Sequence, residues 1–203
     1  MTRPRLRRAA LALVDGVGVR HRIPFQYNPA ELTRSVQLGG EGEGRSGLWR
    51  SRTPPVETLK FELELDADDD QGSGRAPPTV RARLAALEGL VYPRERDLDR
   101  QRSLAATGAF EIAAPVARLL VLEWDPDRVV PVRITELTVT EEAFDADLAP
   151  IRARVSLGLR VLTLADLAAP PGKGAGAGAD LYLGYLRARE SAARDVLPDR
   201  GDE

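Results

Sequence analysis

Apolar and polar residues alternate along several segments of this chain, most clearly in residues 58–66, TLKFELELD. One phase of this segment is apolar and the other is charged: Leu59, Phe61, Leu63 and Leu65 against Lys60, Glu62 and Glu64. Side chains of a strand point alternately to its two faces, so the pattern predicts a strand with one buried and one wet face. Strands of this kind are typical of antiparallel sheets.

Five other segments have strand-like patterns. They span residues 5–15, 19–27, 117–124, 131–140 and 152–162. Residues 119–122 are apolar in both phases, which indicates a central strand. In residues 5–15 two phases compete for the inward face, with Leu6, Ala10 and Ala12 in one and Leu11 and Leu13 in the other. Asp15-Gly16 predicts a hairpin turn before residues 19–27.

The segment IPFQYNP, residues 23–29, combines aromatic residues with two prolines. Pro24 cannot donate a hydrogen bond to a sheet, so it predicts a sheet edge or a bulge, where a neighbouring subunit can pair. Asn28 precedes Pro29 and is restricted to an extended conformation, so the strand ends there. We interpret the segment as a strand end rather than a ligand platform, because few other aromatic residues surround it.

Two segments have helical spacing. In residues 79–91, Thr79 can cap a helix whose apolar positions are Val80, Leu84, Leu87 and Val91. In residues 179–197, Asp180 can cap a helix with a mixed stripe formed by Leu181, Tyr182, Tyr185, Leu186, Ala193 and Val196. Glycine-rich loops separate the elements. The sequence therefore predicts a mainly β domain of roughly seven strands over residues 1–165, a Gly/Ala/Pro linker over 166–180 and a helical tail over 181–203.

Composition narrows the function classes. The chain has 203 residues, a net charge of −2, 5% aromatic residues and no cysteine. The balanced charge gives no electrostatic reason to expect nucleic acid or a membrane as partner, and the low aromatic content argues against base stacking. Disulfides and cysteine chemistry are excluded. The apolar run after the basic N-terminus is shorter than the about 7–15 residues of a signal peptide, so we expect no secretion signal and a location in the cytoplasm.

Four candidate chemical sites lack the pattern that their chemistry needs. The acidic run at residues 66–70 lacks the ordered ligands of a calcium loop. Gly172-Lys173 is followed by glycine instead of the Ser or Thr of a phosphate-binding loop. His21 is the single histidine and shares a strand phase with apolar residues. The acidic residues between 136 and 147 lack nearby sugar-stacking aromatics. We predict a protein that is not an enzyme, with no catalytic, metal-binding or cofactor-binding residues.

The order of these features resembles a known family. The matching pieces are Phe25-Gln26-Tyr27-Asn28-Pro29, Leu59 to Leu65, Pro115 to Trp124 and the segment DADLAPIRARVSLGL, where the family shows a turn followed by an alternating RAxVxLxL strand. This arrangement, from about Leu6 to Leu162, is similar to the tube-like baseplate protein of contractile injection systems that often carries a C-terminal LysM module. No such module follows Leu162, so peptidoglycan binding is not carried over.

The resemblance implies a tube-protein-like β-barrel or sandwich and a structural role. Family members form a ring, a hexamer, that joins the inner tube to the spike of a phage-tail-like particle. The partners implied are further copies of the chain, the tube protein, the spike protein and other baseplate subunits. No cofactor is implied.

Candidate interface residues lie in four places: the strand end at residues 23–29, the polar loop that contains Trp49, the arginines of residues 152–162 and the apolar stripe of residues 179–197. They are Pro24, Phe25, Tyr27, Trp49, Arg152, Arg154, Arg160, Leu181, Tyr182, Tyr185 and Leu186. The arginines either meet acidic neighbouring subunits or solvate one sheet face. The stripe either docks on another subunit or packs on its own domain. The alternative functions are a monomeric β-sandwich that binds a ligand or peptide at Phe25, Tyr27 and Trp49, and a hydrolase that uses scattered carboxylates.

Overall fold

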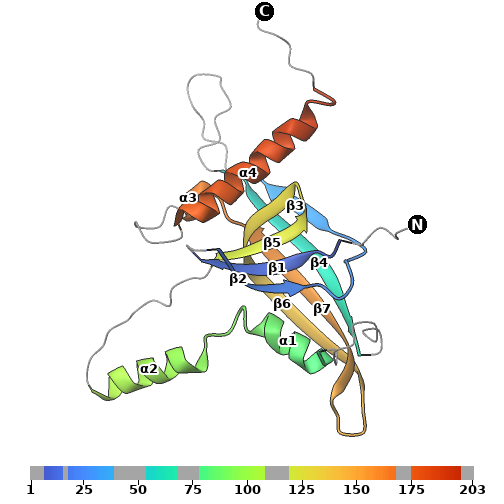
Figure 1. Cartoon of the computed structure of the whole chain (residues 1–203), viewed down its shortest axis with the longest axis vertical. Helices are drawn as coiled ribbons and strands as arrows, with labels where there is room; N and C mark the ends of the chain where they lie inside the picture. Colours follow the sequence, from blue (N-terminus) through green and yellow to red (C-terminus); the bar gives the residue numbers. More distant parts are fainter. Residues whose placement is uncertain are drawn as a thin grey trace, which may run out of the picture. The chain divides into compact units, whose positions relative to one another are not determined.

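Seven strands form one sheet in the order β2-β1-β5-β6-β7-β4-β3 (Figure 1). The computed structural model describes residues 7–15, 18–38, 54–67, 78–107, 119–167 and 175–197. The strands are β1 (Ala10–Asp15), β2 (Gly18–Pro24), β3 (Thr33–Gln37), β4 (Val56–Asp66), β5 (Leu119–Asp125), β6 (Arg128–Phe144) and β7 (Pro150–Val161). The β1–β2, β1–β5, β3–β4 and β5–β6 pairs are antiparallel. The prediction of a mainly β chain is therefore confirmed.

The helices are α1 (Val80–Glu88), α2 (Glu95–Ala106), α3 (Leu164–Leu167) and α4 (Ala175–Ala193). The predicted cap of α1 is confirmed, because the Thr79 side chain accepts a hydrogen bond of 3.2 Å from the backbone N–H of Ala82. Val91, predicted to extend the apolar stripe, lies beyond the end of the helix and is 49% exposed. The sequence reading did not predict α2.

The start of α4 corrects the prediction of a linker up to residue 180. The helix begins at Ala175, so Asp180 lies inside it and is not its cap. The misleading feature was the alternation of glycine and alanine in residues 174–179. Glycine weakens a helix, but alanine is the strongest helix former, and packing can decide between them.

The contacts within the chain define two compact units. The first comprises residues 1–64, 119–139 and 154–203, and the second comprises residues 65–118 and 140–153. Strands β4, β6 and β7 each have residues in both units.

The burial of β4 and β7 follows the predicted alternation. In β4 the apolar phase is buried and the charged phase is exposed along residues 59–65. In β7 the buried positions include Ala153, Val155, Leu157, Leu159 and Val161. Strand β1 behaves differently, because Ala10, Leu11 and Ala12 are all fully buried. It lies between β2 and β5, and both of its faces are covered, so neither of the competing phases is outward.

An aromatic cluster lies in the core of the first unit. The ring centroids of Phe25 and Phe61 are 5.5 Å apart, as are those of Phe61 and Trp124. The tilted geometry of both pairs is favourable for aromatic rings. Phe25 follows β2, Phe61 lies in β4 and Trp124 lies in β5, and β4 and β5 are not neighbours in the sheet.

Pro24 lies at a sheet edge, as its chemistry predicted. It is the last residue of β2, which is an edge strand of the sheet. The β1–β2 ladder also shifts register between Leu13 and Val14. The opposite edge is β3, in which all five residues are exposed.

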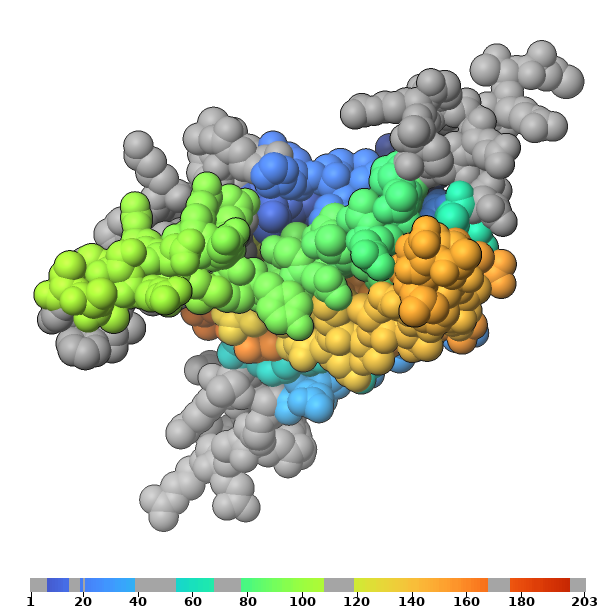
Figure 2. All heavy atoms as spheres, turned by 90° about the horizontal axis from the view of Figure 1, so that it is seen from below, coloured from blue at the N-terminus to red at the C-terminus, as the bar shows by residue number. Residues whose placement is uncertain are grey.

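In the second unit, α1 buries Val80, Leu84 and Leu87. Helix α2 buries no residue, and its side chains stand out on the surface seen in Figure 2, where α1 and α2 are green. The turn between β6 and β7 is held by Asp145, whose Oδ1 accepts hydrogen bonds of 2.9 Å and 2.8 Å from the N–H groups of Asp147 and Ala149. Leu148 in this turn has a φ of 58° and is 75% exposed.

Candidate functional site

Helix α4 lies against β5 and α3 within the first unit (Figure 1). A Cβ atom on Gly178 would lie 2.8 Å from Cδ2 of Leu167 and 3.2 Å from Cδ2 of Leu119. Glycine at this position therefore allows the helix to approach its neighbours closely. The C-terminal stripe is held by its own chain at Tyr185, which is 3% exposed, while Leu181, Tyr182 and Leu186 are half-buried.

A buried polar cluster joins α4 to strands β3 and β4. The Tyr185 hydroxyl donates a hydrogen bond of 2.7 Å to Oε1 of Glu57, and Nη1 of Arg189 lies 3.2 Å from Oε2 of Glu57. The Arg34 guanidinium on β3 approaches the same carboxylate at 3.9 Å. Glu57 is only 7% exposed. A buried carboxylate is costly without partners, and here a hydroxyl and two cations from α4 and β3 supply them.

The titration of Tyr185 reflects this cluster. Burial raises the pKa of Tyr185 above its usual value of 10.0, and the hydrogen bond to Glu57 and the charge of that carboxylate act in the same direction. The Arg189 guanidinium lies 5.5 Å from the centre of the Tyr185 ring. The cluster thus keeps the hydroxyl protonated as a donor to Glu57.

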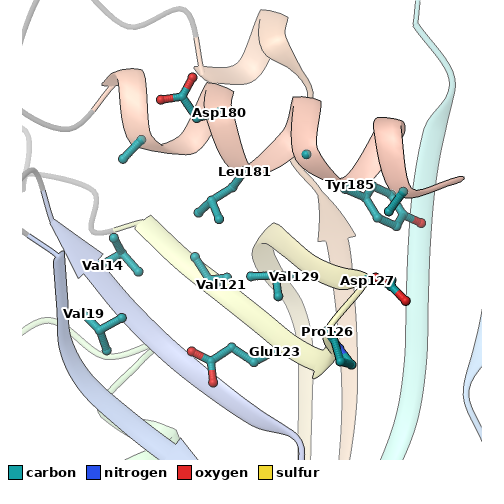
Figure 3. A pocket seen from close by; sticks show the side chains of 13 residues that line it. Val14, Val19, Val121, Glu123, Pro126, Asp127, Val129, Asp180, Leu181 and Tyr185 are labelled. Atoms are coloured by element: carbon teal, nitrogen blue, oxygen red, sulfur yellow. The ribbon is translucent and has the colours of Figure 1, made fainter. Parts of the chain in front are cut away.

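An open groove of about 650 Å³ lies between α4 and the strands β1, β2, β5 and β6. Figure 3 shows Leu181 pointing from α4 toward Val121 on β5 and Val14 on β1. Val129 and the half-exposed Val19 continue the apolar lining.

Polar groups of the groove include one ion pair and two carboxylates. Oε2 of Glu123 accepts a hydrogen bond of 2.6 Å from Nε of Arg22. Asp127 and Asp180 also line the groove, and both are exposed. The groove is therefore apolar inside, with acidic groups around it.

The chain between β7 and α3 is held by Asp166. Its carboxylate accepts hydrogen bonds from the N–H and the hydroxyl of Thr163, at 3.0 Å and 2.9 Å, and from Nη2 of Arg160 at 2.9 Å. Burial alone would raise the pKa of Asp166. The two Thr163 hydrogen bonds and the charges of Arg160 and Arg133 outweigh it, so the pKa lies below the usual 3.8. Arg160, a predicted interface residue, is thus paired within the chain.

The other two predicted arginines of β7 are paired as well. Nη2 of Arg152 lies 3.0 Å from Asp66, and Nε of Arg154 lies 3.1 Å from Glu62. Both acids lie on β4, the neighbour of β7 in the sheet. These cross-strand pairs neutralise the arginines, which favours their role in solvating the sheet over that of a basic stripe.

The remaining predicted interface residues are not brought together. Phe25 is 2% exposed and belongs to the core, which is a correction to its place on an interface or a ligand-binding mouth. Pro24 is exposed and Tyr27 is half-buried. Trp49 lies outside the described residues.

Sequence reasoning missed Glu57 and Glu123. The sequence contains a signal for Glu57, because it has the same strand phase as Leu59 and Phe61. Its side chain is therefore expected on the same inward face of the strand. Within the described residues, no group of acidic or histidine side chains is arranged to hold a metal ion, and no helix is long and apolar enough to cross a membrane. Neither the models of known protein families nor the curated protein sequences match this chain.

Proposed function

We propose that this chain is a structural subunit of a contractile injection system, whose copies form a ring that joins the inner tube to the spike. The basis is the resemblance of the ordered motifs to the tube-like baseplate family. The order of elements supports it in part: β4 is followed by the expected helix, α1, and β5, β6 and β7 come later in the chain, although a second helix, α2, lies between α1 and β5.

The observation that carries the proposal is the pair of edges of the sheet. Strands β2 and β3 lie at its two ends, and every residue of β3 is exposed. Exposed edges present unpaired N–H and C=O groups, which favour pairing with another chain. Pairing of β2 of one copy with β3 of the next uses two different surfaces, so repetition closes into a ring when the rotation permits.

The aromatic cluster supports the tube-like form. Phe61 on β4 contacts Trp124 on β5, although β6 and β7 lie between these strands in the sheet. A curled sheet, as in a barrel or sandwich, allows such a contact between strands that are not neighbours.

The backbone of β2 identifies the residue at which edge pairing can be tested. The N–H of Phe25 donates to the carbonyl oxygen of Ala9, at 2.9 Å. In an antiparallel ladder, hydrogen-bonded residue pairs alternate with pairs that are not hydrogen-bonded. The register pairs Ile23 with Leu11 and Arg22 with Ala12. Counting from the bonded pair of Phe25 and Ala9, the Ile23 pair is hydrogen-bonded and the Arg22 pair is not. The backbone N–H of Arg22 therefore points away from β1, toward the free edge.

The test compares two substitutions at this position. Arg22→Pro removes the outward donor, while Arg22→Ala removes the same side chain and keeps the donor. Proline with its nitrogen facing outward is tolerated on an edge strand, so both variants are expected to fold. We expect the natural chain and Arg22→Ala to form a closed oligomer in native mass spectrometry, and Arg22→Pro to remain monomeric. Equal assembly of both variants, with unchanged circular dichroism, contradicts pairing through β2.

The groove beside α4 favours the alternative function of a monomeric binding module. Its volume of about 650 Å³ is within the range of small-ligand sites. It is not the mouth predicted from Phe25, Tyr27 and Trp49. A chain that stays monomeric at every concentration, also with tube protein present, would favour this alternative over the ring.

A further inference from the structure

The two edge strands of the sheet, β2 and β3, run in the same direction. Four of the neighbouring strand pairs are antiparallel by their registers. The β6–β7 pair reverses at the turn held by Asp145, and the β7–β4 pair joins Arg152 to Asp66 and Arg154 to Glu62, so its numbering runs in opposite directions. Seven strands form six such pairs, and six reversals restore the starting direction.

This shared direction decides how β2 and β3 can meet in the proposed ring. Neighbouring copies of a ring are related by a single rotation, which is at most about 120° when the ring has three or more copies. Reversal of a strand needs a rotation of about 180°, so β3 of the next copy keeps the direction of β2. The pairing of the two edges is therefore parallel, although the pairs within the sheet are antiparallel.

Strand β3 turns uncovered apolar side chains toward the inner face of the sheet. The inner face is the face on which Phe61 packs against Trp124. Val36 lies opposite Glu57, which has the phase of Phe61, and Leu38 directly follows β3 in the phase of Val36. Val36 is 44% exposed and Leu38 is 83% exposed, the highest value for a large apolar side chain in the described part of the chain. The inner face thus ends at β3 with exposed apolar surface.

Strand β2 presents the other end of the same inner face. Ile23 lies opposite Leu11, and Leu11 lies opposite Leu122, which has the phase of Trp124. His21 has the phase of Ile23; Ile23 is half-buried and His21 is exposed. When two copies meet with their free edges side by side and their strands in one direction, the inner face of β2 continues into the inner face of β3.

We propose that β2 of one copy pairs in parallel with β3 of the next copy, with Leu38 of that copy beside Ile23 and Val36 beside His21. This contact covers the apolar side chains that each copy leaves exposed at the β3 edge. The inference rests on the proposed ring, and it names the orientation and the register of the contact between its copies.

The register follows from what each neighbour can cover. A shift by one residue would turn Val36 and Leu38 to the opposite face. A shift by two residues would place Leu38 beside Phe25, which is only 2% exposed and therefore has no free surface to share. The same shift in the other direction would leave Ile23 without an apolar neighbour, because glycines follow Leu38.

The charges of the two edges do not oppose this contact. Arg22 is paired with Glu123 of its own copy at 2.6 Å, and Arg34 lies 3.9 Å from Glu57 of its own copy. Arg22 lies on the groove face and Arg34 has the phase of the inner face, so the two guanidinium groups stay on opposite faces of the joined sheet. Residues 35–40 carry no charge.

The absence of cysteine allows a disulfide test on the full chain. Ile23→Cys with Leu38→Cys brings cysteines of two copies together in the parallel arrangement, whereas Val19→Cys with Leu38→Cys does so in an antiparallel one. Neighbouring strands lie about 4.8 Å apart, a distance that suits a disulfide.

Under mild oxidation we expect disulfide-linked oligomers to form at least about tenfold faster in the first double variant, because pairing raises the effective concentration of its cysteines. Denaturing gels without reductant measure these oligomers. Equal rates, faster linkage in the second double variant, or a product that stays monomeric overturn the inference.

A charge at position 38 tests the same contact without a disulfide. Leu38→Asp is expected to weaken self-association at least about tenfold, because the carboxylate would be buried beside Ile23. Val196→Asp is the matched control, since Val196 is 80% exposed and lies outside the proposed contact, and it should leave association unchanged. Equal association of the two variants in analytical ultracentrifugation overturns the inference.

The outcomes separate this inference from the ring itself. If the natural chain assembles and Arg22→Pro does not, while Ile23→Cys with Leu38→Cys fails to link copies, the edges pair but the parallel register is wrong. If the natural chain stays monomeric, the ring and the parallel register are both wrong.

Discussion

The hydroxyl of Tyr185 on α4 donates a hydrogen bond of 2.7 Å to the buried carboxylate of Glu57 on β4, across 128 positions of sequence. This contact fixes the C-terminal helix on the β domain. It also positions the groove, because Tyr185 lines it as well. Loss of this bond should therefore lower the stability of the whole β domain, and not only loosen the attachment of α4.

Tyr185→Phe is expected to lower the free energy of unfolding by about 1–3 kcal/mol, since it removes a donor from a buried carboxylate. Arg189 and Arg34 remain near Glu57, which keeps the loss from being larger. Urea denaturation followed by circular dichroism measures the change. The matched control is Tyr182→Phe on the same helix, whose side chain is half-buried. A loss of the same size in the control would show that Glu57 is not the cause.

The raised pKa of Tyr185 predicts a loss of stability at high pH. A group whose pKa is higher in the folded state contributes fully below its unfolded pKa of about 10 and loses the contribution as pH rises through the folded value. We expect the free energy of unfolding to fall above that pH, and to fall less steeply in Tyr185→Phe. Denaturation at a series of alkaline pH values checks this. Identical slopes for both proteins would contradict it.

Two glycines of α4 are expected to respond oppositely to alanine. At Gly184 a Cβ atom meets nothing within 4 Å, so Gly184→Ala should stabilise the protein by about 0.5–1 kcal/mol through helix propensity alone. At Gly178 the Cβ atom would lie 2.8 Å from Leu167, so Leu167 has to move and the gain should be lost or reversed. Thermal unfolding of the two variants tests the packing of α4 on β5 and α3. Equal stabilisation by both would contradict that packing.

Asp166→Ala is expected to destabilise the protein by about 1–3 kcal/mol, because the carboxylate accepts hydrogen bonds from Thr163 and Arg160. The lowered pKa of Asp166 adds a pH dependence with the opposite sign to that of Tyr185. Its contribution is present above the usual 3.8 and is lost as pH falls through the folded value. Acid denaturation should show a shallower loss in the variant. Asp127→Ala, at an exposed position, is the control and should change stability by less than about 0.5 kcal/mol.

The sequence predicted the parts of the sheet where one face is buried and the other is wet. Strands β4 and β7 carry this alternation, and their inward residues are buried as expected. Strand β1 was ambiguous for a physical reason, because both of its faces are covered and periodicity then carries no information. Pro24 was informative since its missing N–H restricts it whatever surrounds it.

The elements that were missed lack a local pattern that marks them in the sequence. Helix α2 buries no residue, so it has no apolar stripe to read. The start of α4 is glycine-rich and resembles a linker, yet Gly178 provides the close approach to Leu119 and Leu167. The partners of Glu57 come from residues 34, 185 and 189, and no local pattern connects these to residue 57.

The central claim is that copies of this chain form a ring between tube and spike. Cryo-electron microscopy of contractile particles that contain the chain tests it most directly. The account predicts a ring of this chain in the layer next to the spike, with β2 of each copy beside β3 of the next. Absence of the chain from that layer, in particles that are otherwise complete, would contradict it.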